Sequence, residues 1–536
     1  MRLSYLWMAG WTLAGVLGVQ AALSEDAQAL GQDILGYGKL TGEQREQLVE
    51  RLSKKSLKPL SSEQREQIQR ACVDASATMI GHNAKGQLKV VKDPGAKAIM
   101  KLAGDYLNRL PAATTPAHPA AEDLFGQIPE KAPRVKQSVK IDPAVVRWQA
   151  TGLYAAPGEL VTLVFPDAWV GKGLQVHVSG HRDNISVKKN LMRLPTKPSR
   201  SFPVDSKEVK VAAAFGGALY IDTGNKVRAG KSFQVQVNHA LQAPYFVLGK
   251  SDPKAWREQG RLAPAPYAEL VTDRIALSFP SAWIRDLADP TELLKYWDKV
   301  VALHDELGGM AHTRYGPERV NVDVQISVGL FHAGYPMQGP QKQCRGVVDL
   351  EKLKIQGNWG WFHELGHEAQ RRPDKAWGWN NPYTFDGSVE VTVNLFSSHA
   401  MDRLKMENRG GWSWTASPEE VRQRAHKALS TGKSYSEFGA GEKLAMYLLL
   451  RDQFGWESIG KVLAGYCKDQ DAGKAMPKEN QAKRDAFVLR MSKQTGHNLT
   501  PYVEKLWGVK ISPETAEQLK ALPVWIPKGF DKYMEG

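Results

Sequence analysis

The sequence predicts a multidomain α+β protein with a helical N-terminal region, a β-sandwich, and a third domain that mixes helices with strands before becoming mainly helical. Three observations predict this. The chain has 536 residues, enough for several domains of roughly 100–200 residues each. Short β-branched runs bounded by turn residues fill its middle third. Amphipathic patterns typical of helices lie on both sides of that stretch.

Residues 1–21 resemble a cleavable signal peptide. Arg2 is followed by an apolar run from Leu6 to Val19, and small residues end the run at Ala21. We expect export into the periplasm or the extracellular space of a bacterium, with cleavage near Ala21. No later apolar run approaches the ~20 residues that a membrane span needs, so we do not expect a membrane-spanning protein.

Residues 22–110 are expected to be helical. Two segments there resemble each other, "TGEQREQLVERL" from Thr41 and "SSEQREQIQRAC" from Ser61. Each begins with a hydroxyl residue and has Gln three positions later, which is a capping-box signal. Two copies predict a helical hairpin or spacer. The Pro- and Ala-rich residues 111–135 that follow are expected to form a linker.

Residues 136–252 are expected to form the β-sandwich, because runs such as "GELVTLVFP" and "SFQVQVNH" are short and regularly spaced. His177, His181 and His239 fall in this range, where strand alternation could place some of them on one face as metal ligands. The alternative, which we favour, is surface histidines or histidines whose hydrogen bonds are satisfied within the strands. Residues 253–536 are expected to form the third domain.

Composition excludes several classes of protein. The formal net charge is +14, but the basic residues are spread along the chain without a known nucleic-acid-binding pattern, so we expect no nucleic-acid partner. The three cysteines, Cys72, Cys344 and Cys467, lie far apart without CxxC pairing. This excludes a disulfide-dense scaffold and a thiolate zinc site, and it allows at most one internal disulfide.

The most specific pattern is "NWGWFHELGHEAQRR", residues 358–372. On a helix, His363 and His367 share a face and can bind one metal ion, and Glu364 lies beside them as a candidate general base. A helix is expected because Asn358 can cap its start and an apolar stripe follows. That stripe comprises Trp361, Leu365 and Ala369, and Pro373 stands where the helix should end. The alternative is a chance match on a polar helix surface.

A catalytic zinc ion usually takes three protein ligands. Downstream, Asp386 or Ser388 can cap a second helix, which places Glu390 in its first turn. We predict Glu390 as the third ligand, ahead of Glu368, Asp374 and Asp386. One turn further along, Asn394 would share the face of Glu390 and could hydrogen-bond a ligand.

The segments "WFHELGHEAQ" and "TFDGSVEVTVNLFS" closely resemble the enhancin-like and mucin-degrading zinc metallopeptidases. "TGLYAAPGELVTLVFP", "APYAELVTDRIALSFPS" and "DVQISVGLFHAGYP" resemble further parts of that family, so the resemblance covers roughly residues 145–525. It implies a thermolysin-like (gluzincin) domain with one zinc ion held by His363, His367 and Glu390. It also implies Glu364 as catalytic base and endopeptidase action on O-glycosylated proteins such as mucins.

Side chains that could contact the substrate surround the motif. Aromatic rings stack on sugar faces, and we expect one or two of Trp377, Trp379 and Tyr383 to line the cleft. His332 and Tyr335, in "FHAGYP", are candidate donors to the oxyanion of the reaction. The alternative for this pair is a structural turn enforced by Gly334 and Pro336.

The sequence therefore predicts a secreted zinc endopeptidase acting on mucin-type O-glycoproteins. Two alternatives stay open. One is a gluzincin that cleaves peptides without requiring a glycan, and the other is a carbohydrate-binding adhesin with a silent peptidase domain. The complete set of His363, Glu364, His367 and Glu390 argues against the adhesin, because an inactive domain has no need of all four.

Overall fold

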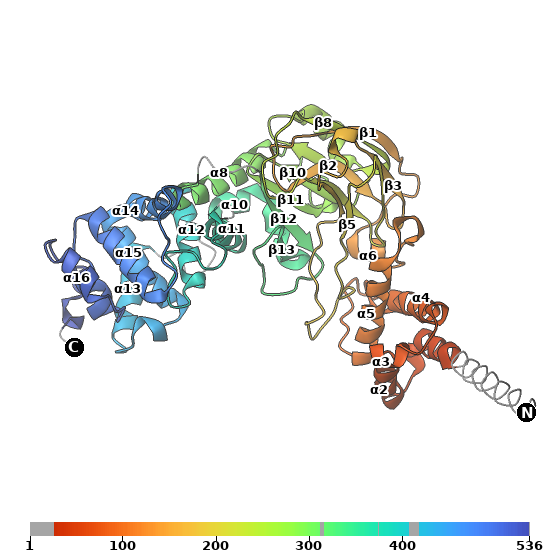
Figure 1. Cartoon of the computed structure of the whole chain (residues 1–536), viewed down its shortest axis with the longest axis horizontal. Coiled ribbons are helices and arrows are strands. Elements are labelled where there is room, and N and C mark those ends of the chain that lie inside the picture. Colours follow the sequence, from red (N-terminus) through yellow and green to blue (C-terminus); the bar gives the residue numbers. More distant parts are fainter. Residues whose placement is uncertain (1–25, 311–315, 373–374, 407–416, 535–536) are drawn as a thin grey trace, which may run out of the picture.

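The computed structural model describes residues 26–310, 316–372, 375–406 and 417–534. The predicted signal peptide lies outside these ranges. The N-terminal helices occupy one end of an elongated molecule, two sheets its middle, and the C-terminal helices the other end (Figure 1). Among the described helices, none combines the length and the apolar character needed to cross a membrane.

The N-terminal region is helical, as predicted. Residues 26–35 are helical, and η1 (Tyr37–Lys39), α2 (Gly42–Arg51), α3 (Lys54–Leu57), α4 (Ser62–Met79) and α5 (Pro94–Arg109) follow. Both capping boxes are present. Thr41 and Gln44 cap α2, while Ser61 and Gln64 cap α4, each with reciprocal backbone and side-chain bonds. The two similar segments therefore mark two helix starts.

The prediction of a linker at residues 111–135 is wrong. This stretch contains η2 (Ala112–Thr114) and α6 (Ala121–Phe125), and Phe125 is only 4% exposed. The Phe125 ring lies 4.6 Å from the ring of His181 and 6.4 Å from that of Tyr267. Proline limits regular structure without requiring exposure, and alanine is readily buried, so this composition did not reveal that the segment packs between the helices and the sheets.

The first sheet has eight antiparallel strands. They are β1 (Val135–Ile141), β2 (Trp148–Ala155), β3 (Val161–Val164), β4 (Gln175–Val178), β5 (Arg200–Pro203), β6 (Glu208–Val211), β7 (Gly217–Asp222) and β8 (Phe233–Gln242). Their order is β5-β4-β7-β2-β8-β3-β6, and β1 also pairs with β8. His239 breaks β8 with a φ of 65°. The residues before it pair with β1 and β3, whereas Leu241 and Gln242 pair with β2.

The second sheet has the order β13-β12-β11-β10-β9. It comprises β9 (Tyr245–Val247), β10 (Tyr267–Val271), β11 (Ile275–Pro280), β12 (Glu318–Asp323) and β13 (Met337–Pro340). Strands β10 and β11 are antiparallel, and the other neighbouring pairs are parallel. Strand β9 lies within residues 136–252 but belongs to this second sheet.

Helices follow and flank the second sheet, and the chain is mainly helical beyond Ser388, as predicted. They are α7 (Pro253–Glu258), α8 (Thr291–Gly308), α9 (Gln341–Cys344), α10 (Leu350–Gln356), α11 (Trp359–Arg371), α12 (Val389–Arg403), α13 (Pro418–Leu429), α14 (Ala440–Asp471), α15 (Asn480–Thr495) and α16 (Pro513–Leu519). Short helical turns join them, including η5 (Ser281–Trp283) and η6 (Arg345–Val348). Helix α8 contacts both α11 and α12, which holds those two helices side by side.

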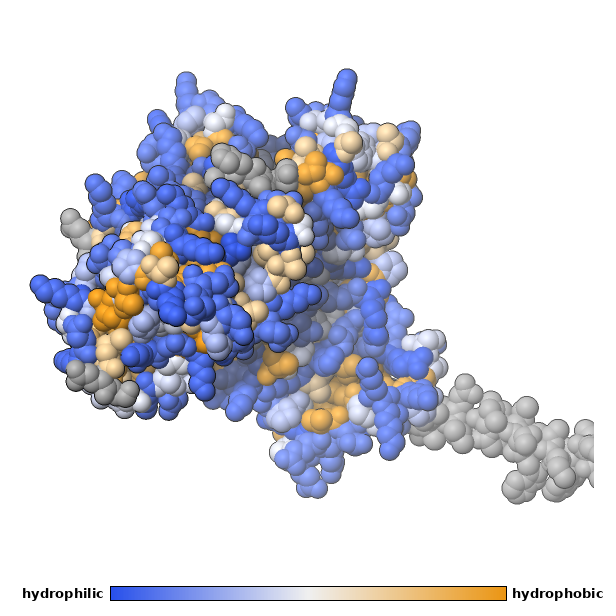
Figure 2. Space-filling view, turned by 60° about the vertical axis from the view of Figure 1, so that its left-hand side comes forward, coloured by the Kyte–Doolittle hydropathy of each residue, from blue (hydrophilic) through white to orange (hydrophobic). Residues whose placement is uncertain are grey.

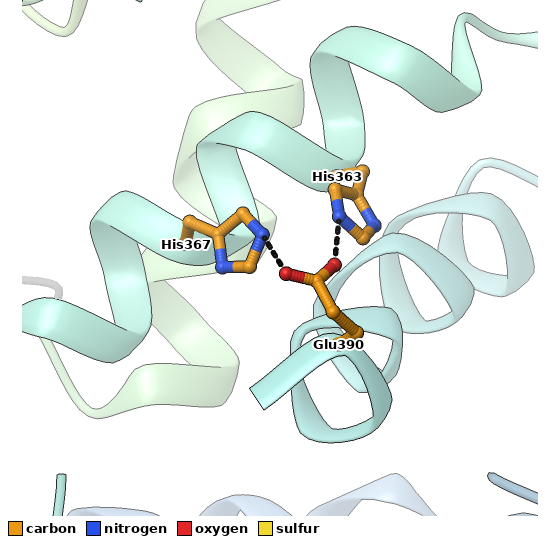
Figure 3. A group of neighbouring side chains, drawn as sticks. All are labelled: His363, His367 and Glu390. Carbon is orange, nitrogen blue, oxygen red and sulfur yellow. Dashed lines mark hydrogen bonds and ion pairs between the residues drawn. The ribbon is translucent and has the colours of Figure 1, made fainter. Parts of the chain in front are cut away.

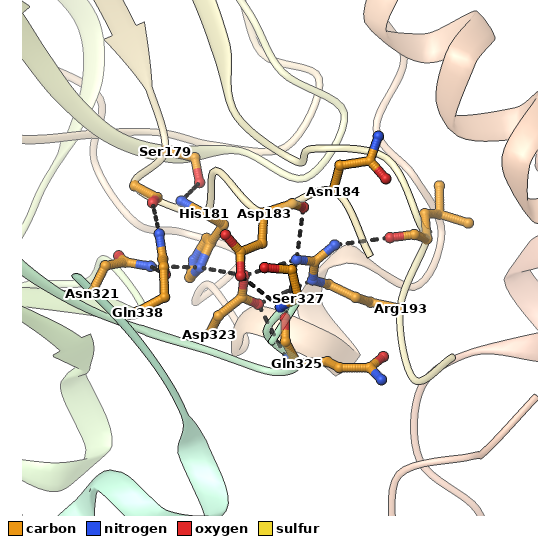
Figure 4. Close-up of polar contacts among 12 residues, drawn as sticks. Ser179, His181, Asp183, Asn184, Arg193, Asn321, Asp323, Gln325, Ser327 and Gln338 are labelled. Carbon is orange, nitrogen blue, oxygen red and sulfur yellow. Dashed lines mark hydrogen bonds and ion pairs between the residues drawn. The ribbon is translucent and has the colours of Figure 1, made fainter. Parts of the chain in front are cut away.

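Buried charges join the two sheets (Figure 4). Arg193, from the connection between β4 and β5, donates to both carboxylate oxygens of Asp323 at 3.1 and 3.0 Å. Both side chains are essentially inaccessible. Burial raises the pKa of Asp323, but the charges of Arg193 and His181 outweigh burial and hold it below its ordinary value. The end of β12 is therefore tied to the first sheet by an ion pair in a low-dielectric environment.

The histidines of the first sheet do not form a metal site with one another. His177 bonds to Ser201 and Asp222, and His181 pairs with Asp323 at 3.6 Å. His239 is exposed beside Glu159. The favoured alternative, surface or hydrogen-bonded histidines, is confirmed. All three cysteines are buried free thiols.

Candidate metal centre

Helix α11 presents its two histidines as the sequence predicts. Asn358 caps the helix, since its Oδ1 accepts from the Trp361 N–H at 3.2 Å. Trp361, Leu365 and Ala369 are buried against the core, which turns the opposite face toward α12. The helix ends at Arg371, and Arg372 adopts a left-handed conformation with φ 44°. Pro373 lies outside the described residues.

Glu390 completes the cluster (Figure 3). Its two carboxylate oxygens lie 3.0 Å from His363 Nε2 and 3.5 Å from His367 Nε2. One ligand atom from each of the three residues lies within 4.8 Å of the others. Glu390 stands second in α12, after the N-cap Ser388. Two imidazoles and one carboxylate are the donor set of many catalytic zinc sites, so the residues fit the metal that the sequence predicts.

The competing third ligands point elsewhere. Asp386 pairs with Arg484 through both carboxylate oxygens. Glu368 accepts a hydrogen bond from the Gly334 N–H at 2.8 Å and another from Arg371 at 3.1 Å. Asp374 lies outside the described residues.

Asn394 fixes the orientation of His363, as its predicted supporting role requires. Its side-chain oxygen lies 2.8 Å from His363 Nδ1, and its amide nitrogen donates to the Glu390 carbonyl at 2.7 Å. An amide oxygen only accepts, so Nδ1 carries the proton. Once Nε2 gives up the proton that it shares with Glu390 here, its lone pair can coordinate a metal ion.

The electrostatics distinguish the two glutamates. Hydrogen bonds from His363 and His367 hold the pKa of Glu390 well below its ordinary value, so it is ionised at neutral pH. Glu364 is buried, and burial raises its pKa, although the two histidines oppose the shift. A carboxylate whose pKa is raised toward neutrality is a better proton acceptor. The site thus contains one permanently charged ligand and one candidate base.

His332 lies near Glu364, since the charge of each shifts the pKa of the other. Its ring nitrogens are both engaged, however. Nε2 donates to Asp183 Oδ2 at 2.7 Å, and Nδ1 donates to the Ala333 carbonyl at 3.0 Å. These contacts match the alternative of a structural turn, and the role of His332 as a donor to an oxyanion stays a prediction. Asp183 favours the protonated ring, which in that state places positive charge near Glu364.

Tyr335 also does not face the ligands. Its ring lies under the Arg147 guanidinium at 4.2 Å and against Trp148, with ring centroids 5.7 Å apart. Both neighbours belong to the first sheet or its preceding loop. These contacts match the alternative that residues 332–336 form a structural turn.

The three candidate aromatics have different surroundings. Trp379 is 54% exposed, and its ring centroid lies 5.3 Å from that of His367. Trp377 is half-buried and donates from its indole to Gln470. Tyr383 is only 2% exposed and packs in the helical core, so it is not among the one or two rings expected to line the cleft. Trp379 is the aromatic that could stack on a substrate beside the ligands.

Two contributors to the site were not predicted. Asp183 comes from the first sheet's β4–β5 connection, and no local pattern distinguishes it from a surface carboxylate. Glu368 was considered only as a ligand. Burial and the charge of Glu318 raise its pKa to about 7, and its bond to Gly334 holds the turn that carries His332. The HExxH spacing and the capping pattern gave no signal for either residue.

Comparison with known proteins agrees with this geometry. Residues 239–508 match the family of peptidase M60, enhancin and enhancin-like, and residues 130–238 match the N-terminal domain of M60-like peptidases. Among solved structures, IMPa from Pseudomonas aeruginosa in complex with an O-glycopeptide superposes with a TM-score of 0.54 at 15% identity. That match covers 87% of this chain and 63% of IMPa. ZmpB metallopeptidase from Clostridium perfringens has a TM-score of 0.53 at 14% identity, covering 75% and 83%. These two show a shared fold.

Curated relatives bear other names. A TRPM8 channel-associated factor homolog of Xenopus laevis is 33% identical over 408 residues, which are 76% of this chain and 43% of that protein. Human TRPM8 channel-associated factor 2 is 30% identical over 72% of this chain and 40% of its own length. The chain thus spans about two fifths of these relatives. Its match to the family over half of its length, together with the site geometry, shows that it belongs to the M60 peptidases, enhancin and enhancin-like.

Proposed function

We propose that the protein is an exported zinc endopeptidase that cleaves mucin-type O-glycosylated proteins, with Glu364 as general base. One observation carries the proposal. His363, His367 and Glu390 converge within 4.8 Å, and the buried Glu364 is the next residue after the first of them. Family membership supports metallopeptidase chemistry, and the predicted signal peptide supports export to the periplasm or beyond the cell.

The arrangement of the helices supports a thermolysin-like (gluzincin) domain. Two histidines on α11 and a glutamate at the start of α12 are its defining features, and the five-stranded sheet precedes both helices. For the first sheet we infer a β-sandwich. The bend at His239 lets β8 pair on both of its sides, and buried apolar residues such as Val161, Val176 and Val235 form a core of their own.

The proposed chemistry divides between metal and protein. Zinc held by these ligands would polarise the scissile carbonyl and acidify the attacking water. The Glu364 carboxylate accepts the proton from that water and passes it to the leaving amine. The Asn394 bond keeps His363 in the required tautomer, and the positive ring of His332 limits the cost of a carboxylate buried at position 364.

The glycoprotein substrate is supported by Trp379 and by a structural neighbour. The exposed indole beside His367 offers an apolar face, with the Arg371 guanidinium 4.8 Å from the ring centroid. An aromatic face flanked by a cation suits a sugar, which presents both C–H and hydroxyl groups. IMPa, similar in fold, was solved in complex with an O-glycopeptide.

Other functions have less support. The names of the curated relatives concern a channel, and the chain covers too little of them to carry that role here. A glycan-independent peptidase and a silent adhesin both remain outcomes of the test below. The intact ligand set favours catalysis over the adhesin.

The test is cleavage of one O-glycosylated mucin-domain protein and of its enzymatically deglycosylated twin, analysed by mass spectrometry. The Glu364→Ala variant serves as control. Cleavage of the glycosylated form alone is expected. Cleavage of both forms, or of the bare form alone, would leave a general gluzincin. A zinc-loaded protein that cleaves neither would favour the adhesin.

A further inference from the structure

A cavity of about 920 Å³ lies between the N-terminal helices and the second sheet. The turn at residues 86–88 forms one wall, and the β4–β5 connection with Lys188 and Met192 forms the next. The stretch 324–330 after β12 and the segment with Lys342 and Arg345 close the other sides. Figure 2 shows the surface hollowed between the N-terminal helical region and the rest of the molecule. Ligand sites commonly have volumes of about 300–1,000 Å³.

The charge of this cavity has one sign. Its lining contains Lys188, Lys342 and Arg345 but no aspartate or glutamate. None of these three cations has an ion-pair partner among the described residues, whereas Arg147, Arg193 and Arg319 at the nearby sheet interface each face a carboxylate. Several cations that line one cavity attract anions into it, because no carboxylate in the lining neutralises their charge.

The rest of the lining is mixed in character. Trp283, Leu88 and Leu330 contribute apolar surface, and Gln87 and Gln343 contribute carboxamides. Leu330 is 58% exposed although it lies at the cavity. A ligand that fits this lining carries an anionic group together with hydroxyls and C–H faces. An acidic sugar meets all three requirements.

The cavity shares a segment of chain with the metal centre. Residues 324–330 line the cavity, and Phe331 then packs edge-on against Trp361 of α11, with ring centroids 4.8 Å apart. The next residue, His332, acts electrostatically on Glu364. The chain that lines the cavity thus continues directly into residues that contact the helix of the metal ligands. Residues 86–88 lie outside both family matches, so this wall is additional to the family domains.

We propose that the cavity binds the anionic branch of the substrate's glycan, a sugar that bears a carboxylate or a sulfate. The proposal rests on the O-glycoprotein function inferred above. Lys342 and Arg345 pair with the acidic group, Lys188 adds charge from the β4–β5 connection, and Trp283 with Leu330 contacts the sugar ring.

The test measures binding of free oligosaccharides to the full chain by isothermal titration calorimetry. The probes are a sialylated trisaccharide, a sulfated disaccharide, the neutral disaccharide and a polyglutamate peptide. The variants are Lys342→Glu with Arg345→Glu, and Lys188→Glu. Lys352→Glu is the matched control, because Lys352 on α10 is exposed and forms no ion pair within the part of the chain that the structure describes. Because Lys342 and Arg345 are exposed, their replacement leaves the core unchanged.

The double variant is expected to bind the sialylated or the sulfated sugar about tenfold more weakly, since charge-assisted bonds are lost, while Lys352→Glu binds as wild type. The acidic sugar that binds the double variant more weakly than the wild type shows whether the cavity prefers a carboxylate or a sulfate. Equal affinity of the double variant and the wild type for both acidic sugars would overturn the proposal. So would a polyglutamate peptide that binds as tightly and responds to the same substitutions.

Cleavage of an O-glycoprotein, measured in parallel, separates the two inferences. Cleavage by wild type with sugar binding unaffected by the double variant removes the cavity proposal alone. Failure to cleave any O-glycoprotein removes the proposed function, and sugar binding that depends on Lys342 and Arg345 would still support an acidic-sugar site.

Discussion

The carboxylate of Asp183 lies 2.7 Å from Nε2 of His332, although 149 residues separate them in the chain. Asp183 also accepts from the Ser327 backbone N–H at 2.7 Å. One carboxylate from the first sheet thus holds both ends of the 327–332 segment, and this segment passes beside Glu364.

This pair predicts a pH window of stability. His332 holds the pKa of Asp183 below its ordinary 3.8 against the effect of burial, so that contribution is present above about pH 4 and is lost on acidification. Burial lowers the pKa of His332, but Asp183 outweighs it and raises the pKa above 6.5. That contribution is complete below pH 6.5 and is lost as pH rises through the raised value.

Asp183→Asn should therefore lower the free energy of unfolding by about 1–3 kcal/mol between roughly pH 4 and 6.5, with a smaller effect on either side. Thermal unfolding across pH measures this, and Asp205→Asn is the control, because Asp205 is exposed and has no ion-pair partner among the described residues. If the loss of unfolding free energy did not vary with pH, the pair would not titrate as described.

Replacing Glu390 should remove the metal. Glu390→Gln loses the charge that both histidines face, so the purified variant should contain much less than one zinc ion per chain and should not cleave. Glu364→Gln should retain zinc and lose about 10²–10⁴ in kcat. Metal analysis with parallel kinetics separates the roles, with the exposed Glu457→Gln as control. Full zinc occupancy in Glu390→Gln would remove it from the ligand set.

Asn394→Ala should weaken zinc binding about 10–100-fold, because His363 loses the partner that sets its tautomer. Competition with a chelator of known affinity measures the change. Asn394→Asp, which keeps an acceptor oxygen, should restore most of the affinity. An alanine variant that holds zinc as tightly as wild type would show that the ring is oriented by packing alone.

Trp379→Ala should raise KM for the glycosylated substrate about fivefold, because the exposed indole face that contacts the sugar is lost. The zinc content should stay unchanged, since Trp379 is not one of the three metal ligands. Trp379→Phe should recover part of the loss by keeping an aromatic face. If KM for a bare peptide rose by the same factor, Trp379 would contact the peptide and not the sugar.

Asp323→Asn should destabilise the fold by about 3–5 kcal/mol, because Arg193 would stay buried without its counter-charge. Chemical denaturation monitored by intrinsic fluorescence measures the loss. A change below about 1 kcal/mol would show that the remaining acceptors of Arg193 suffice, which are the carbonyls of Asp183, Leu194, Thr196 and Gln325.

Sequence patterns predicted the features that depend on residues close together in the chain. The Asn358 cap, the shared face of His363 and His367, and the position of Glu390 all follow from helix geometry within a few residues. The partner of His332 could not be predicted, because Asp183 reaches it through the docking of two sheets. The sequence also did not reveal which aromatic side chains are buried. Tyr383 and Trp379 stand four residues apart in one aromatic stretch, yet only the fold places one in the core and the other at the surface.

The buried ion pairs between the sheets make the two family segments a single folding unit. A polypeptide beginning at residue 239 would keep Asp323 but lose Arg193 and His181, and it would bury this carboxylate without the two side chains that pair with it. Neither family segment, residues 130–238 or residues 239–508, can therefore be replaced by that of a distant relative without compensating substitutions in the other. Recombination at residue 238 between distant members of the family should be selected against unless both sides of each pair move together.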